Sequence, residues 1–342
     1  MQETEKIKTF VGIDAHSKHC SIKAIGVQGE KILEREVPTQ ARRLSQALKG
    51  LAQPACVLIE ASAIAPFVKE SIEGVVDRVI VCETRENRWI SRSEDKSDEA
   101  DADRLARLLR MGEYKEVHVP RGLSRDRGEV VRLYSKVQGD VSRTKNRIKS
   151  KYREHGIHVK GDGVYSMKHR GEWLKKVKGA NVRFLLDVLY KKLDADQAAR
   201  DALLRRLVSM MKGTREFKLL KTIPGVGNIN SATMVAVIDD PFRFEAKRNL
   251  WRYSGLGLRS RWSSDPSRAQ VKGTSGGNRL MKNAALNAAT ASLRGKNRFS
   301  SHYKKMLRDG VDPAMAKRTV ARQILAVALA MLKSGQAFHE AS

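Results

Sequence analysis

The sequence predicts an α/β domain followed by a mainly helical region. Apolar strand-like runs alternate with helical patterns over residues 7–112. Residues 121–215 carry few strand signals and many charges, and residues 216–335 contain helical patterns separated by glycine turns. Three neighbouring strands followed by helix–strand alternation are typical of a mixed sheet covered by helices.

The strands of the first region are predicted from short runs of apolar residues. The second of them alternates apolar residues at Ile22 and Ala24, and a turn at Gln28–Glu30 leads into the third. The fourth is a continuous apolar run, as expected of a buried strand. In chain order the expected strands are Lys8–Asp14, Cys20–Val27, Lys31–Val37, Ala55–Glu60 and Asp77–Cys82.

Three helices are expected among these strands, at Arg42–Gly50, Ile64–Glu73 and Asp98–Met111. In the first, the apolar residues Leu44, Leu48 and Leu51 lie on one side. The third is amphipathic, because its apolar residues recur at helical spacing. They are Ala102, Leu105, Leu108 and Leu109.

The middle of the chain is predicted to form an antiparallel helical hairpin or coiled-coil insert. Its expected helices are Glu129–Arg153, Val177–Leu193 and Asp196–Lys212, with a loop at Gly156–Gly171. The apolar side of the first contains Val130, Leu133, Val137, Val141 and Ile148.

A last helix is expected near the C-terminus. It begins with Asp312 as N-cap and Pro313 at the first helical position, and Gly335 suits its C-cap. Ile324, Val327, Ala328 and Met331 form its apolar stripe. We therefore divide the chain into domains at 1–118, 119–215 and 216–342.

Charge points to nucleic acid as the partner. The chain of 342 residues has 66 Lys and Arg against 38 Asp and Glu, a net charge of +28. Such an excess favours a polyanion. No apolar run reaches the roughly 18 residues that a membrane-spanning helix needs, so we expect no membrane partner.

The N-terminus and the cysteines predict a cytoplasmic protein. Residues 1–6 show no signal-peptide pattern. Cys20, Cys56 and Cys82 form no CxxC pair, so we interpret them as buried thiols and not as disulfides or a zinc site. His16 and His19 are interpreted as part of a polar loop.

Four carboxylates are placed as a metal site would need them. Asp14 and Glu60 each end an apolar strand, and ligands bind at strand ends in open α/β folds. Asp98 and Asp101 stand three apart on one helix and share a face. An oxygen-only set suits Mg²⁺ or Mn²⁺ and in-line displacement at phosphorus. The alternative for the helix pair is an ordinary acidic N-terminus favoured by the helix dipole.

Three other segments are expected to bind phosphates. Gly225 and Gly227 in the turn 223–227 resemble a helix-hairpin-helix DNA-backbone binder, although a plain helix–helix turn has the same pattern. Ser263 and Ser264 lie among arginines and could bind a phosphate or act as nucleophiles, although chemistry alone favours a flexible polar loop here. The loop arginines are Arg259, Arg261 and Arg268. The third segment is the basic helix with Arg143, Lys145, Arg147 and Lys149, for which a merely solvated face is the alternative.

These motifs resemble, in this order, the DEDD transposases of IS110-type insertion sequences, a group that includes the Piv DNA invertases. The N-terminal motifs are GIDAHSK at 12–18, VLIEAS at 57–62 and KSDEADA at 96–102. The C-terminal ones are IPGVG at 223–227 and GNRL at 277–280. The resemblance covers nearly the whole chain and is weak through residues 113–215.

The resemblance implies an RNase H-like (RuvC-like) N-terminal domain in which Asp14, Glu60, Asp98 and Asp101 bind Mg²⁺. It also implies a serine that attacks the DNA phosphate and forms a covalent link. Spacing from Gly255 and Gly277 selects Ser263, whereas alignment on Trp262 selects Ser264. The chain lacks the family's usual glycine after the serine and the proline of its GLTP motif.

The resemblance further implies a structured guide RNA from the element, with donor and target DNA as partners. Strand exchange needs several cuts held together, so we expect a dimer that pairs to a tetramer. The function expected is therefore that of a DNA transposase or site-specific recombinase. Two alternatives stay open: a RuvC-like structure-specific nuclease that uses water, and a nucleic-acid-binding protein without enzymatic activity.

Overall fold

The computed structural model describes residues 7–83, 98–261, 270–273 and 276–340. The chain forms two compact units, residues 1–119 and 120–342, which we describe one at a time. The predicted three-domain division, with a second boundary at residue 215, stays a prediction. No helix among the described residues is both long and apolar enough to cross a membrane.

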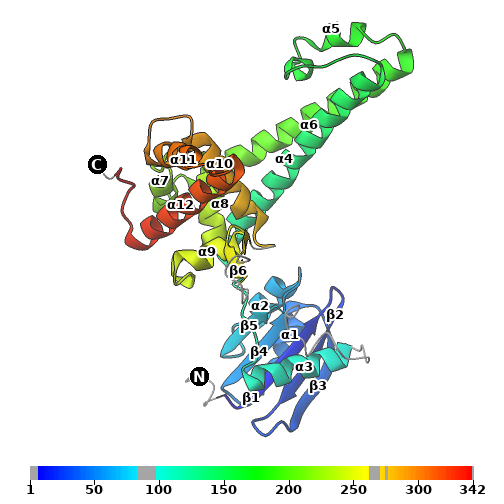
Figure 1. Ribbon diagram of the computed structural model, residues 1–342. Helices are drawn as coiled ribbons and strands as arrows, with labels where there is room; N and C mark the ends of the chain where they lie inside the picture. The colour runs from blue at the N-terminus through cyan, green and yellow to red at the C-terminus, as the bar shows by residue number, and fades with distance from the viewer. Residues whose placement is uncertain (1–6, 84–97, 262–269, 274–275, 341–342) are drawn as a thin grey trace. The chain divides into compact units, whose positions relative to one another are not determined.

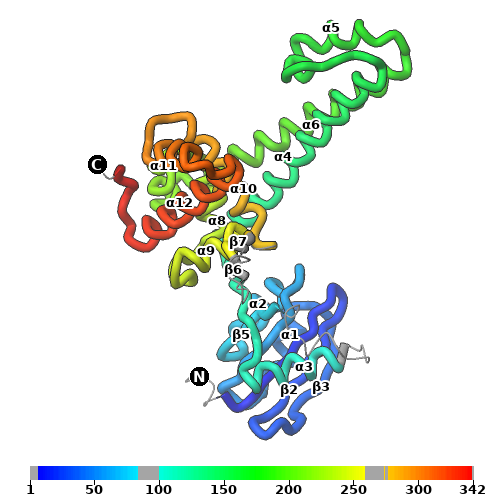
Figure 2. The backbone as a smooth tube through the Cα atoms, in the orientation of Figure 1, coloured from blue at the N-terminus to red at the C-terminus, as the bar shows by residue number. Residues whose placement is uncertain are grey.

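The first unit is built on a mixed five-stranded sheet in the order β3-β2-β1-β4-β5 (Figures 1 and 2). β1 pairs with β2, and β2 with β3, in antiparallel fashion, while β4 is parallel to β1 and β5 to β4. The strands are β1 Thr9–Ala15, β2 His19–Ile25, β3 Lys31–Pro38, β4 Ala55–Glu60 and β5 Arg78–Cys82. Five strands were predicted in these places, and their bounds shift by two residues at most.

Helices cover both faces of this sheet. α1 (Ala41–Leu48) and α2 (Ala65–Ile72) pack on the face that buries Val11 and Val57. α3 (Asp98–Met111) packs on the opposite face, against Phe10 and Leu58, and Figure 1 shows it lying across the strands. Alternation along each strand therefore assigns even-numbered residues of β1 and β4 to the α3 face.

The second unit contains a long helical hairpin. α4 (Gly122–Glu154) packs along α6 (Ala180–Met211), and α5 (Arg170–Lys175) lies at the far end (Figure 1). A small core closes that end, where the hydroxyls of Tyr152 and Tyr190 lie 3.0 Å apart. α4 begins seven residues before its predicted start at 129, and its predicted apolar residue Leu133 is exposed, while Val131 and Tyr134 are buried instead.

The two helices predicted at 177–193 and 196–212 are one helix, and that prediction was wrong. Aspartates favour helix starts, which suggested a break at Asp194–Asp196. In the structure both carboxylates have partners outside their own backbone. Asp194 accepts two bonds of 2.6 Å from Arg170, and Asp196 accepts from Thr144 at 3.0 Å and from Lys192 at 3.0 Å. Neither side chain therefore competes for the backbone of α6.

The C-terminal part of the second unit packs six helices around one apolar core. The predicted caps of α12 are confirmed: the Asp312 carboxylate accepts from Met315 N–H at 2.9 Å, and Gly335 is left-handed. A two-stranded hairpin, β6 (Leu258–Arg261) and β7 (Gln270–Gly273), was not predicted. Its strands flank the segment with Ser263 and Ser264, where a polar loop was expected and which lies outside the described residues. The helices are α7 Arg215–Leu220, α8 Asn228–Ile238, α9 Lys247–Tyr253, α10 Arg279–Ser292, α11 Arg298–Arg308 and α12 Pro313–Ser334.

Candidate functional site

Asp14 and Glu60 end two adjacent strands at the same level. β1 and β4 are parallel neighbours, and Ile13 pairs with Ile59, the residues just before the two carboxylates. Both carboxylates occupy even-numbered positions, so both lie on the face that α3 covers. Asp14 is 8% exposed, whereas Glu60 is half-buried.

The direction of α3 brings its acidic N-terminus to the same edge. Arg110, near the C-terminal end of α3, donates to the carbonyl oxygen of Val27 at 3.1 Å, beyond the far end of β2. α3 therefore runs opposite to β1. Its middle lies on Gly12, where an added Cβ would be 2.0 Å from the Ala102 carbonyl oxygen.

The same geometry sets the height of Asp98. Asp98 precedes Ala102 by four residues, or about 6 Å along a helix. Asp14 follows Gly12 by two residues, or about 7 Å along a strand. The backbone of Asp98 therefore lies level with Asp14; its side chain is outside the described residues.

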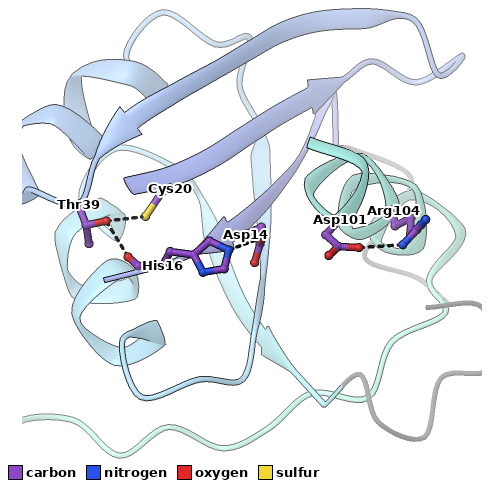
Figure 3. A network of polar contacts seen from close by, with 6 residues as sticks. All are labelled: Asp14, His16, Cys20, Thr39, Asp101 and Arg104. Atoms are coloured by element: carbon purple, nitrogen blue, oxygen red, sulfur yellow. Dashed lines mark hydrogen bonds and ion pairs between the residues drawn. The ribbon is translucent and has the colours of Figure 1, made fainter. Parts of the chain in front are cut away.

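Asp14 and Asp101 each have a neighbour in the described structure (Figure 3). Asp14 Oδ2 is 2.9 Å from Nε2 of His16, and Asp101 Oδ1 accepts from Arg104 Nη1 at 2.8 Å. The sequence interpretation assigned His16 and His19 to a polar loop. His19 instead begins β2, and His16 contacts the carboxylate two residues before it. The spacing of two residues between Asp14, near the end of its strand, and His16 could have predicted this contact.

Ser21 is a polar residue that the sequence analysis missed. It pairs with Asp14 across β1 and β2, so its side chain lies on the same face. Ser21 is 3% exposed, and its Oγ has no hydrogen-bond partner among the described residues. A buried hydroxyl without a partner is costly, so this position suits a bound water or ion.

The thiol of Cys82 borders Glu60, since the two residues pair between β4 and β5. Burial, with a smaller contribution from the nearby Glu60 carboxylate, raises the pKa of Cys82 to about 12. Cys20, Cys56 and Cys82 are all buried and free, which confirms their interpretation as thiols. The carboxylates and the imidazole of His16 are therefore the groups at this edge that could bind a cation.

The donor set fits a hard divalent cation. Aspartate and glutamate oxygens are the ligands preferred by Mg²⁺ and Mn²⁺. Within the described side chains, which exclude that of Asp98, no three acidic, histidine or cysteine groups are close enough to hold a metal ion. The backbone thus brings three of the four positions, Asp14, Glu60 and Asp98, to one level, with Asp101 three residues along α3.

The segment with the candidate serines is closed at its base by a backbone crossing. An added Cβ on Gly277 would lie 2.4 Å from Gly255 N, and Asn278 N–H donates to Tyr253 O at 2.6 Å. β6 and β7 extend from this base. Arg259 and Arg261 are on β6, with side chains outside the described residues, and Ser263, Ser264 and Arg268 lie wholly outside them.

Gly225 and Gly227 have different surroundings. Gly225 has φ +85°, and an added Cβ would lie 2.3 Å from Ala288 O in α10. Gly227 precedes α8 and would meet nothing within 4 Å. Both line a cavity of about 900 Å³ with Arg205 and Lys212. Gly225 thus has a packing role, and Gly227 is the one open to a ligand.

The four basic residues of α4 also differ. Arg143 pairs with Asp140 on its own helix. Lys145 and Lys149 lie over the ring of Tyr165, with Nζ at 4.7 Å and 5.3 Å from its centre, and Lys149 is also 3.9 Å from Asp162. Arg147 is exposed and has no ion pair within the described part of the chain. Arg147 is therefore the one most available to a phosphate.

Comparison with known proteins gives two matches in chain order. A transposase model of the DEDD IS110 type matches residues 11–155, which contain Asp14, Glu60, Asp98 and Asp101. The model described as transposase IS116/IS110/IS902 family matches residues 217–304, which contain Ser263. The chain belongs to the IS110 family of transposases. The two IS110 models match separate parts of the chain, so the family assignment does not depend on a single motif.

A curated IS110 relative agrees. The chain is 28% identical over 147 residues to the insertion element IS110 uncharacterized 43.6 kDa protein of Streptomyces coelicolor. The match covers 43% of this chain and 36% of that protein. The chain therefore matches little more than a third of its relative's length.

Proposed function

We propose that this IS110-family chain is a DNA transposase or site-specific recombinase of an insertion sequence. One observation carries the proposal: Asp14 and Glu60, at the ends of two parallel strands, lie on the face of the sheet that α3 covers. The acidic N-terminus of α3 lies at the same edge. The two family matches support it, because they include this edge and the serine segment.

The N-terminal unit is proposed to be RNase H-like and to bind Mg²⁺, or Mn²⁺, through Asp14, Glu60, Asp98 and Asp101. A bound divalent cation would supply Lewis-acid stabilisation of charge on phosphate oxygens. Asp14 is largely buried, so the protein holds that carboxylate in place before any ligand arrives. Arg104 partly offsets the charge of Asp101 and would reduce repulsion within the group.

The C-terminal unit is proposed to supply the nucleophile, Ser263 or Ser264. Its Oγ would form a bond to phosphorus while the bond from phosphorus to the leaving DNA oxygen breaks. The serine proton goes to a base, and the leaving oxygen takes up a proton. The phosphoserine link keeps the bond energy, so strands can rejoin without ATP.

The partners proposed are donor DNA, target DNA and a structured guide RNA from the element. The net charge of +28 supports extensive contact with phosphates. Strand exchange needs several cut strands held together, so we propose a dimer that pairs to a tetramer. Activity should be lost after RNase treatment of the purified complex and regained when the element RNA is added.

Four single variants test this function: Asp14→Asn, Glu60→Gln, Asp98→Asn and Asp101→Asn. Each should abolish strand exchange on DNA with element ends, because each removes a negative ligand without removing much volume. Nucleic acid binding should stay close to that of the wild type. Glu83→Gln, in the loop after β5, serves as the matched control. Full exchange by any of the four would remove that residue from the site, and full exchange by all of them would refute the proposal.

A further inference from the structure

A cavity of about 230 Å³ lies at the base of the β6–β7 hairpin, inside the second unit. Its walls include the backbone of Gly255, Gly257 and Gly273, which have no side chains to fill it. Leu258 and Gly273, which line it, are the first residue pair of the hairpin. The cavity therefore opens where the two strands start.

Three cations from two helices line this cavity: Lys282 of α10, and Arg318 and Arg322 of α12. None of the three has an ion pair with a carboxylate among the residues that the structure describes. Arg318 and Arg322 stand four apart on α12, a spacing at which like charges destabilise a helix. A bound anion would offset this repulsion.

Arg322 is fixed in position. Its Nη2 donates to Thr319 Oγ1 at 2.7 Å, and its Nη1 donates to Leu256 O at 3.4 Å. Burial lowers the pKa of Arg322, and the charge of Arg318 lowers it further. A half-buried guanidinium beside a second one is stabilised by a bound anion, and these hydrogen bonds hold Arg322 at the wall of the cavity.

We propose that this cavity binds a backbone phosphate of the DNA strand that the hairpin engages, through Lys282, Arg318 and Arg322. The choice of DNA rests on the proposed function. Phosphate is favoured because several donors from two helices can meet its oxygens at once, and because guanidinium groups match its geometry.

The cavity's position gives this phosphate a role. From Leu258 to Arg261, β6 carries the chain about 10 Å before the segment with Ser263 and Ser264 begins. A phosphate held in the cavity would therefore fix the DNA strand at the base of the hairpin whose two strands flank that segment.

The test is DNA binding by the full chain across a range of salt concentrations. Arg318→Gln and Lys282→Gln should each weaken binding to a labelled DNA oligonucleotide, on the order of tenfold. Because both act on one phosphate, the double variant should lower the salt slope by about one unit and not by two. Lys317→Gln is the matched control, since Lys317 is on α12 but does not line the cavity.

Two outcomes would overturn the cavity proposal. One is that the variants bind DNA as Lys317→Gln does, with unchanged thermal unfolding. The other is that the double variant loses about two units of slope, which indicates two separate surface contacts. Selective loss of binding to an RNA oligonucleotide of the same sequence would likewise contradict the choice of DNA.

A second experiment distinguishes failure of the cavity proposal from failure of the proposed function. The same proteins are incubated with labelled DNA carrying element ends, the element RNA and Mg²⁺, and are run on denaturing gels to detect a covalent adduct. Loss of DNA affinity in the variants, with no adduct in the wild type, supports the cavity and contradicts serine chemistry. An adduct in the wild type, with normal affinity in the variants, does the reverse.

Discussion

A Cβ atom on Gly12 of β1 would lie 2.0 Å from the carbonyl oxygen of Ala102 in α3. It would also lie 2.5 Å from Ala106 N, so the obstacle is backbone and cannot rotate away. Glycine at position 12 therefore lets the helix lie directly on the strand. This contact places the start of α3 level with Asp14, and the candidate metal site depends on it.

Gly12→Ala should accordingly displace α3 and lower the free energy of unfolding by about 1–3 kcal/mol, the usual cost of overpacking. Urea denaturation followed by circular dichroism measures this change. Gly74→Ala is the control, because a Cβ there meets nothing within 4 Å and its φ is not positive. Equal stability of the two variants would show that the close contact is not needed.

Gly225→Ala and Gly227→Ala should separate folding from binding. The first meets backbone of α10 and strains a left-handed φ, so it should destabilise the second unit. The second meets open space, so thermal unfolding should stay normal while DNA affinity falls. Stable, fully binding Gly225→Ala protein would contradict the packing role of this turn.

Arg147→Gln should reduce the salt slope of nucleic acid binding by about one unit, since its side chain is exposed and forms no ion pair within the described residues. Arg143→Gln should have a smaller effect, because Arg143 already pairs with Asp140 on α4. Fluorescence anisotropy at several salt concentrations measures both. Equal slopes for wild type and Arg147→Gln would show that this face of α4 is only solvated.

The thiols should be inert in the folded protein at pH 8. Burial raises the pKa of Cys56 to about 11 and that of Cys82 to about 12, and thiol reagents attack the thiolate. All three cysteines should react once the protein is unfolded in guanidinium chloride. Rapid reaction of the native protein would contradict their burial.

The same thiols should make the free energy of unfolding depend on pH. Their pKa values are higher in the folded state than the value of about 8.5 for a free thiol. The folded state thus holds more protons above that pH, so the free energy of unfolding should fall as pH rises from about 8.5 towards 12. Cys82→Ala should make this fall less steep in denaturation series at different pH.

Much of the first unit could be predicted because its signals are local. Apolar runs ended by Asp14 and Glu60 give both the strands and the polar ends that follow them. The helix Asp98–Met111 was predicted with the bounds it has. The direction of α3 could not be predicted, because it depends on the Gly12–Ala102 approach and on the Arg110–Val27 bond, both between distant parts of the sequence.

The errors lie where tertiary partners override local preference. Asp194 suggested a helix break, but Arg170 holds it on the surface of one continuous helix. β6 was missed because its four residues include Arg259 and Arg261 and show no clear apolar pattern. The cavity cations Lys282 and Arg318 are far apart in sequence and meet only through the packing of α10 on α12.

The central claim, that this chain joins itself to DNA through a serine, is tested most directly by denaturing electrophoresis with labelled DNA carrying element ends, the element RNA and Mg²⁺. The wild type should give a covalent adduct, and Ser263→Ala should give none. Ser264→Ala should give a normal or reduced amount, and loss of the adduct only there would move the assignment by one residue. An adduct formed by the Ser263→Ala/Ser264→Ala double variant would contradict the account.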